Sequence, residues 1–495
     1  MKYRLITFFC SYLSRRWSSG IARYQQKIMR TRHIHPVLHL LRWPFILAQG
    51  GIVGLSAACL VGAFRWGLDA VPRHVWPAAR ELPARYGLFG ILLWGAVLVA
   101  LAYGAGRMVR AVPLISGGGI PQVELECQGR LHVPLNIWLR VIAAKFLACL
   151  MDTAGGLSQG REGPSVQLGA GIGAIVDALC GHTESGRRNL LAAGGAAGMA
   201  AAFSAPWAGF IFAFEELKRP VSRTSCLLTL SAAFAAWWGV GAIFGFGQLF
   251  PFDDISAPEP AAWWKLLLVG LALGLGGSLY NRALIRLKTA ESRLPIPRQW
   301  RILPSMLLAG VFLFTLPEIL GGGGTLIVQT GGGGTTFAML LLFLAGKVFF
   351  SLLSFTGDAP GGILMPILCV GALLGLAAGC ALDGVSPSPE NACWLICGMA
   401  GFFAAVLGTP LLGLVLVMEI SGAASCLPAV ALVILTADLT ASRLHITPIY
   451  AALRSSIVVN AIPGGKRRVA LSPRMLQTRS TRPDTRRTAR QSARP

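Results

Sequence analysis

The chain has 495 residues, of which 54% are hydrophobic and only 13% are charged, and its mean hydropathy is +0.61. Soluble domains contain about 25% charged residues, so the composition excludes an ordinary soluble protein and indicates a polytopic membrane protein. The formal net charge of +23 would by itself suggest a nucleic-acid partner, but its distribution argues against one.

The positive charge is concentrated at the two ends of the chain. Residues 1–45 contain nine Lys and Arg and no acidic residue, and residues 464–495 contain ten against one Asp. We interpret 1–44 as a basic N-terminal segment and 463–495 as a basic tail, disordered because it has almost no apolar content. The positive-inside rule places both termini in the cytoplasm, where anionic lipid is the expected contact and a specific polyanion the alternative. No nucleic-acid partner is expected.

Residues 45–462 read as one all-α transmembrane domain. The 60 glycines of the chain favour close helix–helix contacts, and frequent Gly and Pro predict tilted and broken helices. Eleven cysteines are scattered through apolar stretches without a ligand cluster, so no metal and no cofactor are expected. The predicted spans, in chain order, are Pro44–Val71, Tyr86–Val109, Val133–Leu150, Leu190–Phe214, Cys226–Phe250, Trp263–Leu287, Ile302–Leu320, Phe337–Phe355, Ile363–Leu382, Cys393–Met418 and Leu427–Leu444.

Glycine-rich breaks interrupt this domain, first at Ser116-Gly-Gly-Gly-Ile-Pro121 and then at Gly160-Arg-Glu-Gly-Pro164. The second break places a cation and a carboxylate in an apolar stretch and opens a helix over 165–176. An ionisable residue at membrane depth costs roughly 2.5–3.5 kcal/mol on insertion scales, so it usually marks an ion or proton path. The N–H groups of a helix N-terminus bind anions. Glu162 could therefore compete with a mobile anion, as a gate does; a structural salt bridge with Arg161 is the alternative.

Two distant segments share one pattern, which indicates an internal duplication. In residues 195–215 and again in 398–419, Gly-x-x-Gly is followed by a Pro, a Gly three residues later and a Glu nine residues after the Pro. A glycine-rich helix start precedes each segment. Duplication of this kind is typical of transporters built from inverted repeats. We place the two halves at roughly 45–250 and 262–462; generic Gly/Ala-rich packing is the alternative.

Four elements together resemble the signature of the CLC family of chloride channels and chloride/proton antiporters. They are Gly117-Gly-Gly-Ile-Pro121, Gly160-Arg-Glu-Gly-Pro164, Gly362-Ile-Leu-Met-Pro366 and Tyr450, in the family's order and spacing over roughly residues 45–460. The resemblance implies a homodimer of all-α subunits, each with its own anion path. It also implies that helix N-termini face a dehydrated chloride ion in the middle of each subunit.

The resemblance further assigns roles to individual residues. The N–H groups of Ile363 and Leu364 and the hydroxyl of Tyr450 would line the central anion site, and the amides of Arg161 through Gly163 would serve its outer part. Glu162 matches the family's gating glutamate.

Four further carboxylates, and one lysine, also correspond to family positions or to the internal repeat. Glu216 matches the glutamate through which antiporters pass protons from the cytoplasmic side, a role that suits a carboxylate because desolvation raises its pKa towards neutrality. The alternative for Glu216 is a helix cap at the interface. Glu215 and Glu419, related by the repeat, are expected to be structural. Glu124 and Lys145 match a buried charge pair of the family.

The chain departs from the family pattern at two positions. The family's central serine, an anion ligand, falls on Gly118, so this donor is missing; Ser116 could replace it only if the loop were shifted in register. The usual phenylalanine of the third motif is Leu364, which keeps the N–H but loses an aromatic wall. Both changes are expected to weaken the central site and to make its preference for chloride over other monovalent anions less strict.

The expected function is secondary chloride/proton antiport, with a passive proton- or voltage-gated chloride channel as the alternative. A membrane-embedded hydrolase is a distant third, because no histidine lies near Ser165 or Ser204 to act as a general base. A scaffold would leave the buried Arg161 and Glu162 without a purpose. We therefore expect a transporter or channel rather than an enzyme. The short tail leaves no room for the C-terminal nucleotide-binding domains of eukaryotic relatives, so a bacterial plasma-membrane protein is expected.

Overall fold

The computed structural model describes residues 36–252, 255 and 259–460. Residues 36–44 begin the first helix, whereas the rest of the predicted basic segment 1–44 and the whole predicted tail 463–495 lie outside the described residues. The regular structure within the described ranges is helical, and one isolated backbone bridge joins Gly160 to Gly362. The expected all-α fold is confirmed.

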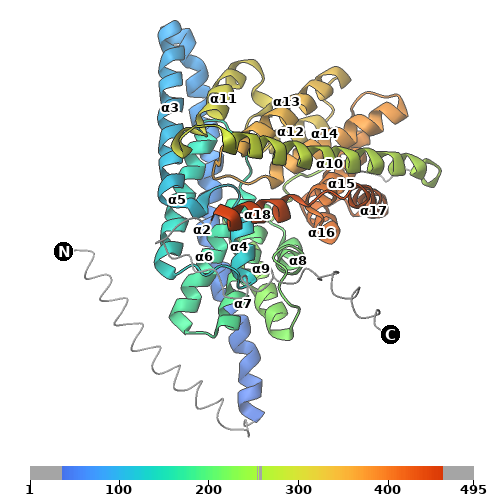
Figure 1. The fold of residues 1–495 in the computed structure, drawn as a ribbon. Helices are drawn as coiled ribbons and strands as arrows, with labels where there is room; N and C mark the ends of the chain where they lie inside the picture. Colours follow the sequence, from blue (N-terminus) through green and yellow to red (C-terminus); the bar gives the residue numbers. More distant parts are fainter. Residues whose placement is uncertain (1–35, 253–254, 256–258, 461–495) are drawn as a thin grey trace, which may run out of the picture.

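The helices follow one another in two successive series. The first series is α2 (Pro36–Tyr86), α3 (Leu88–Ala111), η1 (Pro113–Ile115), α4 (Ile120–Cys127), α5 (Leu135–Ala154), α6 (Glu162–Cys180), α7 (Glu184–Phe203), α8 (Pro206–Glu215) and α9 (Arg223–Phe244). The second series is η2 (Pro260–Ala262), α10 (Trp263–Arg293), η3 (Arg298–Trp300), α11 (Leu303–Thr315), η4 (Pro317–Ile319), α12 (Gly324–Gly331), α13 (Phe337–Thr356), α14 (Leu364–Asp383), η5 (Pro389–Asn391), α15 (Ala392–Leu407), α16 (Pro410–Ser421), η6 (Ala424–Cys426) and α17 (Leu427–Arg443). A last helix, α18 (Ile449–Asn460), crosses the middle of the view in Figure 1.

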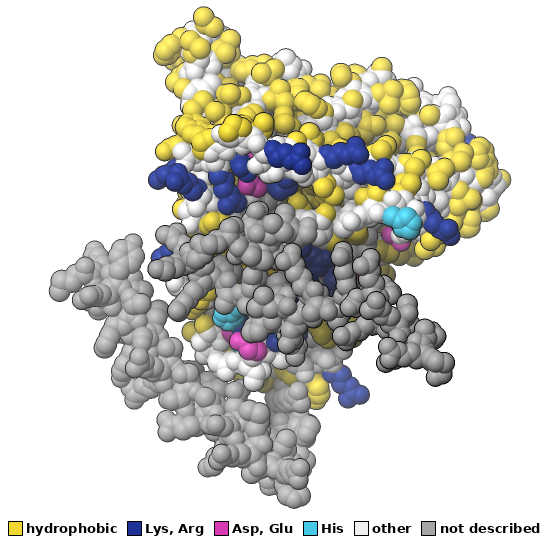
Figure 2. All heavy atoms as spheres, viewed as in Figure 1, with side chains coloured by type: hydrophobic (Ala, Val, Ile, Leu, Met, Phe, Trp, Pro, Cys, Tyr) yellow, Lys and Arg dark blue, Asp and Glu magenta, His cyan; other side chains and the backbone are white. Residues whose placement is uncertain are grey.

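In the described part of the chain, nine helical segments are long and apolar enough to cross a membrane. They are α2, α3, α6, α9, α13 and α14, and also α10, α15 and α17 with the 3-10 turns that precede them. The predicted spans Val133–Leu150 and Ile302–Leu320 correspond to α5 and α11, which are not among the nine; α11 has only 13 residues. Large apolar side chains point outward, as Leu88 does on α3 with 71% exposure, and Figure 2 shows a broad apolar surface. Such a surface is suited to lipid contact.

The predicted spans Leu190–Phe214 and Cys393–Met418 are each broken near the middle, in agreement with the broken helices expected from frequent Gly and Pro. Ser204 ends α7 with a φ of 56°, and Gly408 ends α15 with a φ of 70°. Left-handed residues commonly terminate helices. A proline then begins the next helix two residues later, where its missing N–H costs nothing. The result is two pairs of broken helices, α7–α8 and α15–α16.

The two series repeat each other. α4 and α12 have 8 residues each, and α5 and α13 have 20 each. The same order continues from α6 to α9 and from α14 to α17. The close helix crossings are repeated as well: a Cβ atom at Gly169 would collide with the Gly194 carbonyl, and one at Gly371 would lie 2.6 Å from the Gly398 carbonyl oxygen. Glycine is therefore required where α6 crosses α7 and where α14 crosses α15.

Two glutamates show that the repeats are inverted. Glu419, near the end of α16, accepts hydrogen bonds from the Trp207 and Ala208 amides at the start of α8, at 3.0 and 2.7 Å. Glu215, the last residue of α8, accepts reciprocally from the first amides of α16, Leu411 and Leu412. Each helix start faces the other helix's end, so α8 and α16 run antiparallel. This cap satisfies amides that have no acceptor within their own helix, which is the structural role expected for both glutamates.

Candidate functional site

The glycine-rich breaks of the two halves meet through their backbones. The Gly160 amide donates to the Gly362 carbonyl at 2.7 Å, and the Gly362 amide donates back to the Gly160 carbonyl at 2.8 Å. Helix α6 begins two residues after Gly160, and α14 begins two residues after Gly362. The two helix N-termini therefore lie on either side of one small bridge. Because the first amides of a helix have no intrahelical acceptor, the bridge is surrounded by N–H groups.

The first glycine loop, residues 117–119, packs against this bridge. A Cβ atom at Gly118 would lie 3.9 Å from Gly163 Cα, 3.9 Å from Gly362 Cα and 3.8 Å from the Gly361 carbonyl oxygen. Gly118 is thus next to residues of both other glycine-rich motifs. In contrast, a Cβ atom at Gly163 would lie only 2.7 Å from the Gly118 carbonyl oxygen. Gly163 is therefore needed for the close approach, whereas Gly118 has room for a small side chain.

Ser116 does not replace the missing donor at Gly118. Its side chain faces the carboxylate of Asp358, which also binds Lys288 at 3.0 Å and Arg298 at 3.2 Å. Burial on its own would raise the pKa of Asp358, but Lys288 and Arg298 hold this pKa below its usual range. Asp358 is thus an ionised acceptor for Ser116, and the Ser116 hydroxyl is directed towards Asp358.

Lys145 holds the first glycine loop through backbone carbonyls, so its predicted pairing with Glu124 is wrong. The Lys145 ammonium donates to the Ile115 carbonyl at 2.9 Å and to the Gly117 carbonyl. Glu124 instead pairs with Arg454 of α18 and accepts from Gln128 at 2.8 Å. These two carbonyl groups converge on the buried ammonium of Lys145 and accept its hydrogen bonds in place of the Glu124 carboxylate. Residue types alone do not reveal this geometry.

Glu162 is the first residue of α6 and is fully buried. The backbone N–H groups of Arg161, Glu162 and Met365 face its carboxylate, but neither carboxylate oxygen has a hydrogen-bond partner. Arg161 pairs with Asp69 of α2 at 3.2 Å, so the alternative of a salt bridge between Arg161 and Glu162 is wrong. The Glu162 carboxylate is a buried acid directed at helix N-terminal amides.

Ile363 and Leu364 lie at the start of α14, and both side chains are fully buried. Tyr450 lies on α18 and is also buried, with 2% exposure, and its hydroxyl has no hydrogen-bond partner. The Tyr450 hydroxyl is within electrostatic range of both Glu216 and Glu162. The structure thus brings the last motif close to the carboxylates of the first half.

Glu216 directly follows α8, outside the segments long enough to span a membrane, and has 4% exposure. Burial, together with the nearby carboxylate of Glu124, raises the pKa of Glu216 from 4.5 to about 8, although Lys218 and Arg454 oppose this rise. An acid with such a pKa exchanges protons reversibly near neutral pH. The helix-cap alternative fits Glu215, which caps α16, rather than Glu216.

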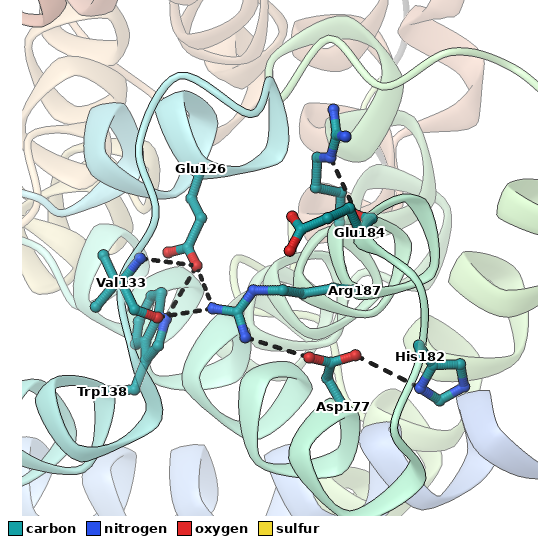
Figure 3. Close-up of polar contacts among 8 residues, drawn as sticks. Glu126, Val133, Trp138, Asp177, His182, Glu184 and Arg187 are labelled. Carbon is teal, nitrogen blue, oxygen red and sulfur yellow. Dashed lines mark hydrogen bonds and ion pairs between the residues drawn. The ribbon is translucent and has the colours of Figure 1, made fainter. Parts of the chain in front are cut away.

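A buried ion network at the end of α6 opposite Glu162 was missed by the sequence analysis. Arg187 at the start of α7 donates to Glu126 Oε1 at 2.6 Å and to Asp177 Oδ2 at 3.2 Å, and His182 lies 3.5 Å from Asp177 (Figure 3). Glu126 also accepts from the Trp138 indole. The signal in the sequence was the presence of ionisable residues in apolar surroundings. This network fixes the end of α6, whose first residue is Glu162, against α4 and α7.

Comparison with known proteins places this arrangement in a family. A family model described as voltage gated chloride channel matches residues 99–442. The H(+)/Cl(−) exchange transporter ClcA of Vibrio campbellii is 33% identical over 422 residues, which cover 82% of this chain and 88% of the relative. ClcA of Citrobacter koseri is 31% identical over 390 residues, covering 77% and 78%.

Solved structures share the fold. A slow cyanobacterial Cl−/H+ antiporter superimposes with a TM-score of 0.78 at 24% identity, covering 84% of this chain and 98% of that one. A CLC-type fluoride/proton antiporter gives a TM-score of 0.65 at 22% identity, covering 83% and 97%. Taken with the family match and the identities above, these likenesses lead to one conclusion. The chain belongs to the voltage gated chloride channel family, that is, to the CLC family.

Proposed function

We propose that this protein exchanges chloride for protons across a membrane, with Glu162 as the gate and Glu216 as the internal proton acceptor. The observation that carries the proposal is the position of Tyr450, whose unpartnered hydroxyl is within electrostatic range of both acids. Two separate acids around one centre are what coupled exchange requires. The naming of relatives at 31–33% identity as H(+)/Cl(−) exchange transporters supports the same reading.

The anion would bind at the N-termini of α6 and α14, without a fixed counter-ion. Partial positive charge on backbone N–H groups can replace part of the hydration shell of chloride and still release the ion. The amides of Ile363 and Leu364 and the hydroxyl of Tyr450 would contact it centrally, and those of Arg161 and Gly163 further out. Gly118 would contribute backbone only.

The proton would follow a different route on the inner side. Glu216 takes a proton from the cytoplasm, which its pKa of about 8 permits near neutral pH. The proton then passes to the Glu162 carboxylate, neutralises it and frees the anion position that the carboxylate occupied. Release of the proton from Glu162 to the outside restores the carboxylate, while chloride moves the opposite way.

The cellular location, the orientation of the termini and the oligomeric state are also part of the proposal. We place it as a multi-pass protein of a bacterial inner membrane with both termini in the cytoplasm, and as a homodimer in contact with lipid. The basic terminal segments and the bacterial sources of the relatives support this. A transporter, rather than an enzyme, is consistent with relatives that are exchangers.

The test is a measurement of reversal potential with purified protein in liposomes. With a fixed chloride gradient, imposing a pH gradient should move the reversal potential away from the chloride equilibrium value. Glu216→Gln, which keeps the size of the side chain but cannot release a proton, should return it to that value. An unshifted potential for the wild type would instead establish a passive channel. Repeating the measurement with fluoride, bromide and nitrate would rank the anions.

A further inference from the structure

The chain contains a second glycine loop, residues 321–323, that repeats the first one. It precedes α12 as residues 117–119 precede α4. Gly321 and Gly323 have φ values of 60° and 90°, close to the 65° and 92° of Gly117 and Gly119. Gly322 thus occupies the place in the second half that Gly118 occupies in the first. This loop is not among the sequence motifs that predicted the site.

The second loop belongs to the second half of the chain and also packs against the Gly160–Gly362 bridge. A Cβ atom at Gly322 would lie 3.2 Å from Met365 Cβ and 3.8 Å from Gly160 Cα. Its counterpart Gly118 faces Gly163 and Gly362. Met365 is 202 positions after Gly163, and Gly362 is 202 positions after Gly160. The two loops therefore contact repeat-related pairs of residues.

A buried lysine holds each loop in the same manner. Lys347 of α13 donates to the Ile319 carbonyl at 2.9 Å and to the Gly321 carbonyl at 2.6 Å. Lys145 makes the corresponding two bonds to Ile115 and Gly117. Lys347 is fully buried, and no carboxylate lies within ion-pairing distance of it in the described part of the chain. Both of these hydrogen bonds go to the carbonyl groups that shape the loop.

The second loop lies next to residues that also neighbour the Glu162 carboxylate. A Cβ atom at Gly160 would collide with Glu162 Oε2 and would lie 2.9 Å from Met365 Cβ. Glu162 and Gly322 therefore share the neighbours Gly160 and Met365. The carboxylate is fully buried and without a hydrogen-bond partner. The backbone N–H groups of Arg161, Glu162 and Met365 face it, but no salt bridge from the described residues fixes it in place, so the surrounding walls also limit its movement.

We propose that the loop 321–323 forms one wall of the Glu162 gate and that Lys347 is a positioning residue for this gate. The inference rests on the proposed function, because it assumes that Glu162 moves. By holding the Ile319 and Gly321 carbonyls, Lys347 keeps Gly322 against Gly160 and Met365 and limits the space into which the carboxylate can swing. Lys145 holds the first loop, which contains Gly118, in the same way.

Other charged and titratable groups surround this region, and the test must leave them unchanged. They are Arg161 beside Glu162, Arg65 and Asp69 on α2, Tyr450 on α18, and Cys369 on α14 next to Lys347. None of them is altered in the variants below.

The experiment compares the pH dependence of chloride flux in liposomes for two kinds of variant. One loosens the loop 321–323, and the other adds a methyl group to it. Lys347→Met removes both hydrogen bonds but keeps the length of the side chain, so the loop relaxes and the carboxylate leaves more readily. We expect the pH midpoint of flux to move to higher pH by roughly half to one unit, a three- to tenfold change in proton concentration. Gly322→Ala adds a methyl group between Met365 and Gly160, and should move the midpoint to lower pH. Gly334→Ala, whose added methyl would contact nothing within 4 Å, is the control.

Two further variants separate positioning from damage to the fold. Lys145→Met should weaken chloride binding, measured by calorimetry, without moving the pH midpoint. In a Glu162→Gln background, Lys347→Met should have no effect on pH dependence, since no carboxylate is left to position. Equal loss of flux in both lysine variants, with unmoved midpoints, would overturn the proposal. Such a result would leave the proposed function intact if the wild type still couples chloride to protons, whereas absent coupling in the wild type would refute that function itself.

Discussion

Gly118 faces Gly163 with enough room for a side chain: a Cβ atom at position 118 would lie 3.9 Å from Gly163 Cα. Its φ is not left-handed, so other residues can adopt the same backbone. We predict that Gly118→Ser folds normally and adds a hydroxyl donor at the inner end of the anion site. A hydrogen bond to a charged group contributes about 1.5–3 kcal/mol, so chloride should bind at least about tenfold more tightly in calorimetry. Gly118→Ala adds the carbon without the donor, and an equal gain in that variant would contradict the assignment.

The unpartnered carboxylate of Glu162 leads to a second prediction. Glu162→Gln keeps the shape of the side chain but cannot ionise, so it should not compete with an anion for the helix amides. Chloride flux should persist and lose its dependence on pH between about 4 and 9, and proton movement should stop. Parallel recordings of chloride efflux and of proton uptake into liposomes would check this. Retention of a wild-type pH profile would exclude Glu162 as the gate.

Glu216 supports a prediction about stability and pH. Its pKa is about 8 in the folded protein against 4.5 when unperturbed, so the folded state binds this proton more tightly than the unfolded state does. The contribution is fully present below pH 4.5 and is lost as pH rises through about 8. Glu216→Gln has no such loss. Its melting temperature in detergent, relative to that of the wild type, should therefore be higher at pH 9 than at pH 5. A difference that does not depend on pH would contradict the raised pKa.

The buried network around Arg187 leads to a prediction about stability. Removing the arginine should destabilise the protein strongly, and a second substitution in the network should restore part of the stability. Arg187→Met leaves Glu126 and Asp177 as buried carboxylates without their cation. Breaking a buried ion pair from one side typically costs about 3–5 kcal/mol. We expect a large drop in melting temperature for Arg187→Met, and partial recovery when Glu126→Gln is added, because one uncompensated charge is then removed. Arg188→Met, at the half-buried neighbouring position whose side chain donates to the Glu184 carbonyl, should change little.

The sequence was sufficient for the parts of the fold that depend on local composition. Apolar stretches located most of the membrane helices, and the Gly-x-x-Gly…Pro pattern indicated the repeat that the helix order shows. Frequent Gly and Pro predicted broken helices, but hydropathy did not locate the breaks at Ser204 and Gly408, because each apolar stretch continues across them. A single left-handed residue followed by a proline ends a helix without changing hydropathy.

The partners of buried charges could not be predicted in the same way. Arg161 pairs with Asp69, 92 positions away, and Glu124 pairs with Arg454, 330 positions away. Lys145 and Lys347 bind backbone carbonyl groups. Every residue type has such a group, so the sequence does not show which of them a lysine binds. The convergence of the four motifs was expected only from family resemblance, since spacing along the chain does not determine which loops meet.

The reciprocal caps of α8 and α16 have a consequence for biosynthesis. The Ala208 amide obtains its acceptor from Glu419, 211 positions later in the chain. While the ribosome is still producing the second half, Glu419 does not yet exist. The first amides of α8 must then form hydrogen bonds with water or lipid headgroups instead. We therefore expect the first half, when released alone, to be a target for membrane proteases, and the second half, co-expressed as a separate fragment, to protect it.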